Sequence, residues 1–196
     1  MGAQAEPDWQ ALKPRLKNGE LVIEGRSPSR GNGVAFVAYK RLKVSPGHVW
    51  PVVRDCQHYK LFMPRTSASD RSDCVEQTCV CHSRVKLPFP LPDLWSRVRT
   101  TMTRLRTGGF QRAWTLLEGN YAHNQGSWRV LPWPGDQRWT LLVYTVDFNP
   151  HISLPDFILQ DAQTGALPNV FTAVERRAKA LRIYSEDDAD KPRRRE

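Results

Sequence analysis

Alternation of hydrophobic and polar positions, with a period of about two, runs through most of the chain. Residues 19–24 and 33–44 are rich in Val, Ile, Phe and Tyr, and the sequence SPSRGNG between them has the composition of a turn. From about residue 65 to residue 148, similar segments recur roughly every 8 to 14 residues, with Gly, Pro and Asn between them. This spacing predicts two strands followed by a long antiparallel meander.

The strands of the meander can be placed from their turns. Residues 67–87 predict a hairpin whose turn lies near 70–72 or near 76–77, and further strands are predicted at 94–105, 110–119, 127–133 and 138–148. On the last strand, one alternating set of residues is predicted to face the interior, namely Thr140, Leu142, Tyr144, Val146 and Phe148.

A helical period replaces this alternation at two places. At the first, Ser45 followed by Pro46 resembles a helix N-cap with proline at the first helical position. An apolar stripe then follows at helical spacing, formed by Val49, Val52, Val53 and Cys56. Pro51 interrupts this helix, because proline lacks the N–H that an interior position uses, so we expect a kink or a tight first turn.

The second helical stretch runs from Leu154 to about Leu181, with its apolar residues on one broad stripe. Gly165 and Pro168 fall within it, so this helix is expected to bend or break near its middle. Near the N-terminus, Pro14 limits the expected helix to a short piece at residues 8–12.

The order of these elements predicts one α+β domain, in which an antiparallel sheet wraps against a long C-terminal helix. We assign residues 1–18 to an N-terminal extension, 19–184 to the domain and 185–196 to a disordered charged tail. The tail holds four basic and five acidic residues, so the residues before it carry a net charge of +10, against a total of +9 for the whole chain. That charge favours anionic partners, either nucleic acid or acidic lipid headgroups.

The chain carries few signs of a membrane span, an export signal or a metal site. No stretch reaches the eighteen or so apolar residues of a spanning helix, and the N-terminus lacks the layout of a signal peptide, so we expect a cytoplasmic protein with reduced thiols.

Cys56 and His58 are two residues apart, so they face different directions on a helix. A zinc site is also disfavoured at residues 74–82, because the spacing C-x4-C-x-C-H lacks paired knuckles. We therefore expect neither metal nor cofactor.

No catalytic motif stands out, and the seven tryptophans are the more informative feature. Five of them fall in the meander. They could pack the core and the sheet surface, or they could line an apolar ligand cavity between sheet and helix.

One segment carries a resemblance to a known family. Residues 44–64, VSPGHVWPVVRDCQHYKLFMP, resemble a helix of the START-like or polyketide-cyclase (SRPBCC) superfamily. The matching positions are Val44, Val49, Trp50, Val53, Asp55, Tyr59, Phe62, Met63 and Pro64. LPFPLPD at 87–93, GSWRVLPW at 126–133, VYTVDFNPHISLPDFI at 143–158 and ALPNVFTAVERRA at 166–178 resemble later parts of the same family, whereas Pro51 and the N-terminal segment depart from its pattern.

This resemblance implies the helix-grip fold, a curved antiparallel sheet around a C-terminal helix with an internal hydrophobic cavity. It also implies binding or transport of a lipid, sterol, quinone or polyketide-like molecule, as in coenzyme-Q-binding proteins. We expect no catalytic residues, and the candidate ligand-binding residues are Phe36, Trp95, Arg97, Trp128, Tyr144, Phe148, Phe157, Ile158 and Ala162. Arg97 would orient a polar headgroup if its face of the strand points inward; otherwise it belongs to an exposed basic strand.

Three functions remain open at this point. A carrier or sensor of a hydrophobic small molecule is the leading hypothesis, with peripheral contact to an anionic membrane. A cyclase or dehydratase would need acid and base groups inside the cavity. An RNA- or ribosome-associated module would need its basic residues in one patch, and this nucleic-acid alternative is the least favoured.

Overall fold

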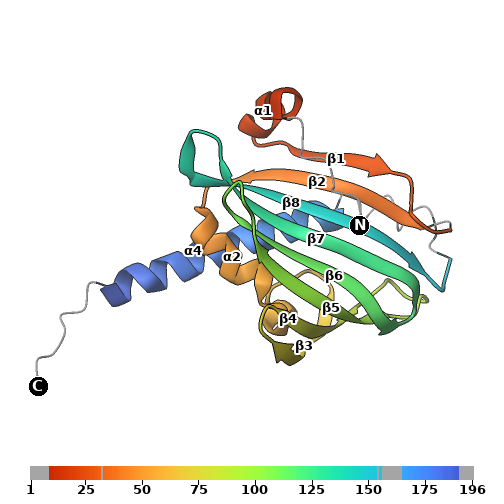
Figure 1. Cartoon of the computed structure of the whole chain (residues 1–196). Helices are drawn as coiled ribbons and strands as arrows, with labels where there is room; N and C mark the ends of the chain where they lie inside the picture. Colours follow the sequence, from red (N-terminus) through yellow and green to blue (C-terminus); the bar gives the residue numbers. More distant parts are fainter. Residues whose placement is uncertain (1–8, 32, 154, 156–164, 190–196) are drawn as a thin grey trace, which may run out of the picture.

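The computed structural model describes residues 9–31, 33–153, 155 and 165–189, and within them eight strands form one curved antiparallel sheet (Figure 1). The strand order is β1-β2-β8-β7-β6-β5-β4-β3. The strands are β1 (Leu21–Arg26), β2 (Val34–Leu42), β3 (Thr66–Val75), β4 (Thr78–Val85), β5 (Leu94–Arg104), β6 (Phe110–Gly119), β7 (Tyr121–Trp133) and β8 (Asp136–Pro150). The helices are α1 (Trp9–Lys17), α2 (Pro46–Arg54), the 3-10 helix η1 (Cys56–Leu61) and α4 (Leu167–Ala189). This is the predicted α+β helix-grip architecture.

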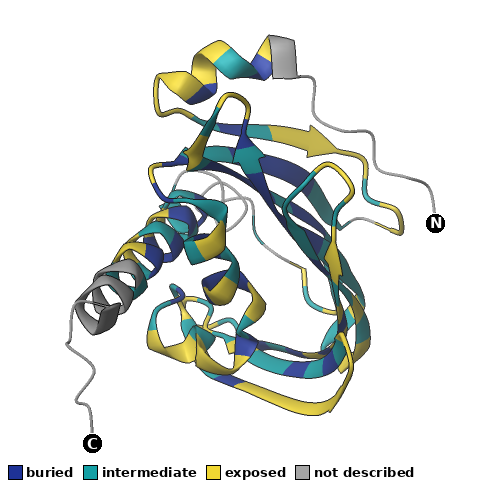
Figure 2. Ribbon diagram, turned by 60° about the vertical axis from the view of Figure 1, so that its left-hand side comes forward, coloured by how far each residue is buried: buried dark blue, intermediate teal, exposed yellow. Residues whose placement is uncertain are grey.

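The sheet curls around α2 and α4, which lie on its concave side, whereas α1 lies on the opposite side (Figures 1 and 2). The main core fills the space between the concave face and the two helices. It includes Val49 and Val53 of α2, Phe171 and Val174 of α4, and apolar residues of the central strands. Within the described residues, no helix has the length and apolar character needed to cross a bilayer.

Helix α2 begins where the sequence predicts it. Ser45 takes the N-cap position and Pro46 the first helical position. The stripe Val49, Val52 and Val53 is buried, as expected. Pro51 lies on the exposed side of the same helix, and Gly47, whose carbonyl would otherwise receive a bond from position 51, is exposed as well. Solvent can therefore satisfy this carbonyl, which explains why a helix accommodates proline here.

The prediction of a short N-terminal helix was wrong, because α1 continues through Pro14 to Lys17. Leu12 and Leu16 are buried on the outer face of the sheet, against Val37, Leu141 and Val143. Burial of these two leucines stabilises the helix beyond the proline, since most helical stability in proteins comes from packing of an apolar face. The sheet is consequently covered on both faces over β2, β7 and β8.

The C-terminal helix differs from the prediction at both ends. α4 starts at Leu167, with Pro168 in its first turn, where a missing N–H costs little. It continues to Ala189, so residues 185–189, which we assigned to a disordered tail, are helical. The expected helical residues 156–164 lie outside the described part of the chain.

The four cysteines form two disulfides, Cys56–Cys81 and Cys74–Cys79, so the expectation of reduced thiols was wrong. Cys74 and Cys79 bracket the β3–β4 turn, which lies at residues 76–77, the second of the two predicted places. Cys56 lies in η1 and Cys81 in β4, and these residues meet because η1 packs on the β3–β4 hairpin. The pairing depends on tertiary contact and cannot be read from spacing alone.

Candidate functional site

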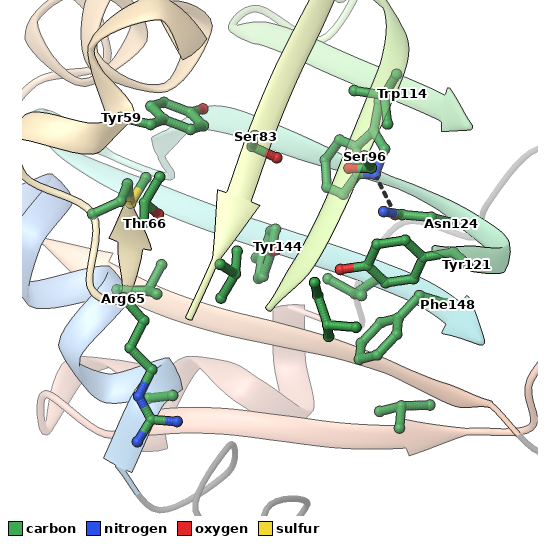
Figure 3. Close-up of a pocket in the computed structure, with 18 of the residues that line it drawn as sticks. Tyr59, Arg65, Thr66, Ser83, Ser96, Trp114, Tyr121, Asn124, Tyr144 and Phe148 are labelled. Carbon is green, nitrogen blue, oxygen red and sulfur yellow. Dashed lines mark hydrogen bonds between the residues drawn. The ribbon is translucent and has the colours of Figure 1, made fainter. Parts of the chain in front are cut away.

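A cavity of about 520 Å³ lies between the concave face of the sheet, η1 and the start of α4. Its lining is mainly aromatic and aliphatic, with a few polar groups (Figure 3). The aromatic residues are Phe36, Tyr59, Trp114, Tyr121, Trp128, Tyr144 and Phe148, and the polar ones include Thr66, Ser83, Ser96, Arg112 and Asn124. Such a size and composition are typical of small-molecule sites.

The strand register shows that this cavity is closed at one end. Residues paired across neighbouring strands share a face, and Arg112, Trp128 and Tyr144 form one such row of cavity-lining residues. In the next same-face row, Phe110, Val130 and Leu142 do not line the cavity. Val130 and Leu142 belong to the core beneath α2, and Trp50 of α2 stacks on Phe110 with ring centroids 5.0 Å apart. The row of Arg112 is therefore the inner end of the cavity.

The opposite end of the cavity lies where several strands and loops come together. Leu94 begins β5, Phe148 lies near the end of β8, and Leu87 lies in the loop between β4 and β5; all three line the cavity. Ala166, Leu167 and Val170 line it from the start of α4. We call this end of the cavity, which is lined by Leu87, Leu94, Phe148 and Ala166, the outer end.

Four of the predicted ligand-binding residues line this cavity: Phe36, Trp128, Tyr144 and Phe148. Trp128 stacks on Tyr144, with ring centroids 4.0 Å apart and planes inclined by 20°, and meets the edge of Phe171 at 5.9 Å. Phe36 contacts Tyr144 edge-on at 6.1 Å. These contacts fix a continuous aromatic wall.

Two predicted residues, Trp95 and Arg97, lie on the other face of β5. Leu94, Ser96 and Val98 line the cavity instead, and along a strand the residues between them point away. Arg97 forms an exposed ion pair with Glu118 at 3.2 Å, so its guanidinium does not reach a ligand in this cavity. The remaining predicted residues, Phe157, Ile158 and Ala162, lie outside the described residues.

Sequence reasoning missed the polar inner end of the cavity. Arg112 is only 4% exposed, and its guanidinium donates to the Tyr59 hydroxyl at 3.2 Å and contacts Cys81 Sγ at 3.3 Å. The alternation of residues 110–119 would have placed Arg112 and Trp114 on one face, but an arginine in a strand is normally exposed, which hid the signal. The Cys56–Cys81 disulfide lines the same end.

The cavity tyrosines are held in their neutral form. Burial raises the pKa of Tyr59 more than the neighbouring Arg112 lowers it, and burial also raises the pKa values of Tyr121 and Tyr144. The Tyr59 hydroxyl donates its proton to the Val53 carbonyl and accepts from Arg112. Tyr59 thus positions the guanidinium and carries no charge of its own.

A glycine opposite a tryptophan shapes the middle of the cavity. Gly126 pairs with Trp114 across β6 and β7, and a Cβ at this position would collide with the indole ring and with the Thr145 carbonyl. The indole N–H donates to Asn124 Oδ1 at 3.0 Å (Figure 3). The missing side chain and this hydrogen bond together hold Trp114 against the sheet and leave space for a ligand.

Comparison with known proteins agrees with this fold. The structure resembles the STAR-related lipid transfer protein of Xanthomonas axonopodis, with a TM-score of 0.67, 16% identity and coverage of 82% of this chain and 98% of that one. Human StAR-related lipid transfer protein 5 gives a TM-score of 0.68 at 11% identity, covering 88% of this chain and 95% of that one. The Zhui aromatase/cyclase of a Streptomyces species gives a TM-score of 0.59 at 19% identity, covering 76% of this chain and 94% of that one.

Sequence comparison identifies the family directly. Among curated proteins, none matches the sequence. The family model described as polyketide cyclase/dehydrase and lipid transport matches residues 42–175, which is more than half of the chain and includes α2, the meander and the start of α4. The chain therefore belongs to the polyketide cyclase/dehydrase and lipid transport family.

Proposed function

We propose that this protein binds and carries a hydrophobic small molecule in its cavity without transforming it chemically. The observation that carries this proposal is the aromatic cavity of about 520 Å³, closed at its inner end. Transfer of apolar surface from water into such a space contributes about 25 cal/mol per Å², or about 0.8 kcal/mol for each methylene group. A ligand with ten methylene groups would gain about 8 kcal/mol, which exceeds the lower estimates of the entropic cost of association.

A second candidate is cyclisation or dehydration of a polyketide, and the pair of Arg112 and Tyr59 inside the cavity favours it. The carrier is better supported, because no Asp or Glu lines the cavity within the described residues and burial raises the pKa values of its tyrosines. His82 is among the lining residues, but its ring lies beside Trp95, with centroids 6.3 Å apart, on the other face of the sheet. The described side chains that face the cavity thus supply no general base at neutral pH.

Turnover separates these two candidates. Conversion of an aromatic polyketide substrate by purified protein, abolished in Tyr59→Phe, would replace the carrier proposal with the enzymatic one. Binding of the same compound without conversion would support the carrier.

We also propose that the outer end of the cavity contacts an anionic membrane. Phe89 is 97% exposed, and it lies two residues from Leu87, which lines the cavity. Lys86 precedes this segment, and its backbone N–H donates to the carbonyl of Arg65. Arg65 also lines the cavity (Figure 3). An exposed aromatic residue beside basic groups suits the interface of an anionic bilayer.

Two experiments test these proposals. Native mass spectrometry of protein purified from its own host, followed by organic extraction, should reveal a bound apolar molecule; a protein that neither retains nor binds any apolar molecule would refute the carrier. Sedimentation with phosphatidylglycerol vesicles should show weaker binding for Phe89→Asp than for Val75→Asp, a control at another exposed apolar residue that is 70% exposed on β3. Equal binding by both variants would exclude the Phe89 contact.

A further inference from the structure

The inner end of the cavity holds a buried positive charge that has no carboxylate partner among the described residues. Arg112 is only 4% exposed, and none of the ion pairs in the described part of the chain includes it. A guanidinium has five N–H donors. Two contacts involve the terminal nitrogens, whereas Nε is buried with no hydrogen-bond partner in the described structure.

The contacts that Arg112 does make are with neutral groups. Tyr59 supplies a hydroxyl oxygen and Cys81 a disulfide sulfur. The rings of Tyr59 and Trp114 lie with their centroids 5.5 and 5.9 Å from the guanidinium carbon. Aromatic faces attract a cation, but they do not neutralise a full charge in a site from which water is largely excluded.

Asp55 is the acidic residue nearest along the chain to Tyr59, but its ion-pair contacts are with His58 and Arg71 and not with Arg112. His58 Nδ1 contacts one of its carboxylate oxygens, and Arg71 Nη1 lies 3.9 Å from the other. Among the described residues, no carboxylate oxygen lies within ion-pair distance, 4.0 Å, of the Arg112 guanidinium. A buried cation without a counter-charge is costly, and its cost falls when an anionic group enters the cavity.

We propose that Arg112 recognises the carboxylate of an amphiphilic ligand, which enters the cavity with its charged end first. The guanidinium fork matches a carboxylate, which can accept from two nitrogens at once. The aromatic rings of Trp114, Trp128 and Tyr144 surround this end and leave the apolar body to extend toward Phe148 and Leu94 at the outer end. This ligand class rests on the carrier function proposed above.

A matched pair of ligands separates recognition of the carboxylate from apolar binding. N-phenyl-1-naphthylamine, a neutral fluorescent probe, reports occupation of the cavity, and dodecanoate or dodecanol is added as competitor. The wild type should bind dodecanoate about 10- to 100-fold more tightly than dodecanol, as expected for hydrogen bonds to a buried charged group. Arg112→Gln should lose this preference and still bind the probe. Arg97→Gln, which removes a guanidinium from the outer face of the neighbouring strand, should keep it.

High salt and a second variant distinguish this buried contact from general attraction of anions to a basic protein. The net charge of +9 attracts any anion, so the preference is also measured at 1 M NaCl, where the Debye length is about 3 Å and a buried contact persists. Arg112→Lys keeps the charge without the fork and should retain part of the preference. No preference in the wild type, its loss at 1 M salt, or its survival in a folded Arg112→Gln protein would overturn the proposal. Failure of the wild type to bind the neutral probe would instead refute the carrier function.

Discussion

The two disulfides should contribute unequally to stability, because they close loops of different length. Cys56 and Cys81 are 25 residues apart and Cys74 and Cys79 are 5 apart. The loss of chain entropy on cross-linking corresponds to about 3.5 kcal/mol for the longer loop and about 2 kcal/mol for the shorter one. Replacing Cys56 and Cys81 by alanine also removes two buried sulfur atoms from the wall of the cavity, at a further cost of about 1 kcal/mol.

Urea unfolding measures this difference directly. The double variant Cys56→Ala/Cys81→Ala should lose about 4 to 5 kcal/mol of unfolding free energy, and Cys74→Ala/Cys79→Ala, which removes one buried sulfur, about 2 to 3 kcal/mol. For wild-type protein unfolded in the presence of dithiothreitol, the unfolding free energy should fall by about the sum of the two entropic contributions. The hairpin disulfide provides the matched control, because neither Cys74 nor Cys79 lines the cavity, although the Cys79 side chain is buried.

Two outcomes would refute this reasoning. Equal losses in the two double variants would show that loop length and burial do not determine the contribution of each bond. An unchanged wild-type midpoint in dithiothreitol, with mass spectrometry showing both bonds reduced in the folded protein, would show that the folded protein is equally stable without either bond.

The other predictions concern the aromatic wall and one largely buried carboxylate. Trp128→Ala should lower the unfolding free energy by about 3 to 5 kcal/mol in urea titrations, because the indole is 3% exposed and packs on Tyr144 and Phe171. Gly126→Ala should push Trp114 into the cavity, weakening binding of the neutral probe in fluorescence titrations and costing about 1 to 3 kcal/mol of stability. Burial tends to raise the pKa of Asp147, but hydrogen bonds from Ser29, His123 and Gln125 outweigh it and lower the pKa. The resulting stabilisation is complete above the unfolded-state pKa of about 3.9 and is lost as pH falls through the lower folded-state pKa. The stability difference between wild type and Asp147→Asn should therefore shrink below about pH 4 in urea unfolding at successive pH values, and a difference independent of pH would contradict the assignment.

Periodicity predicted most of the elements because hydrophobic patterning follows burial. The alternation on β8 correctly placed Tyr144, Val146 and Phe148 toward the interior. It gave no indication that Leu141 and Val143 on the other face are also covered, since that depends on α1. The proline rule underestimated α1 because it considers local hydrogen bonds and not the packing of Leu12 and Leu16 against the sheet.

The site was harder to predict than the fold, because its lining depends on which face of each strand turns inward. On β5, the large apolar ring of Trp95 suggested the inner face, yet Leu94 and Val98 with the small Ser96 between them occupy it. Arg112 was passed over because charged residues in strands are usually exposed. The pairing of Cys56 with Cys81 depends on η1 packing against β4, a contact between segments that are distant in sequence.

The closed inner end gives the cavity a length scale. On β8, the lining residues run from Tyr144 in the inner row to Phe148 at the outer end, and these four steps span about 13 Å at about 3.3 Å per residue. A ligand anchored at the inner row would therefore end inside the cavity if it is shorter than this distance and would emerge from the cavity if it is longer. A bulky substitution at Ser96 should exclude long ligands while still admitting short ones. Relatives with larger or smaller residues at this position would therefore select ligands of different chain length.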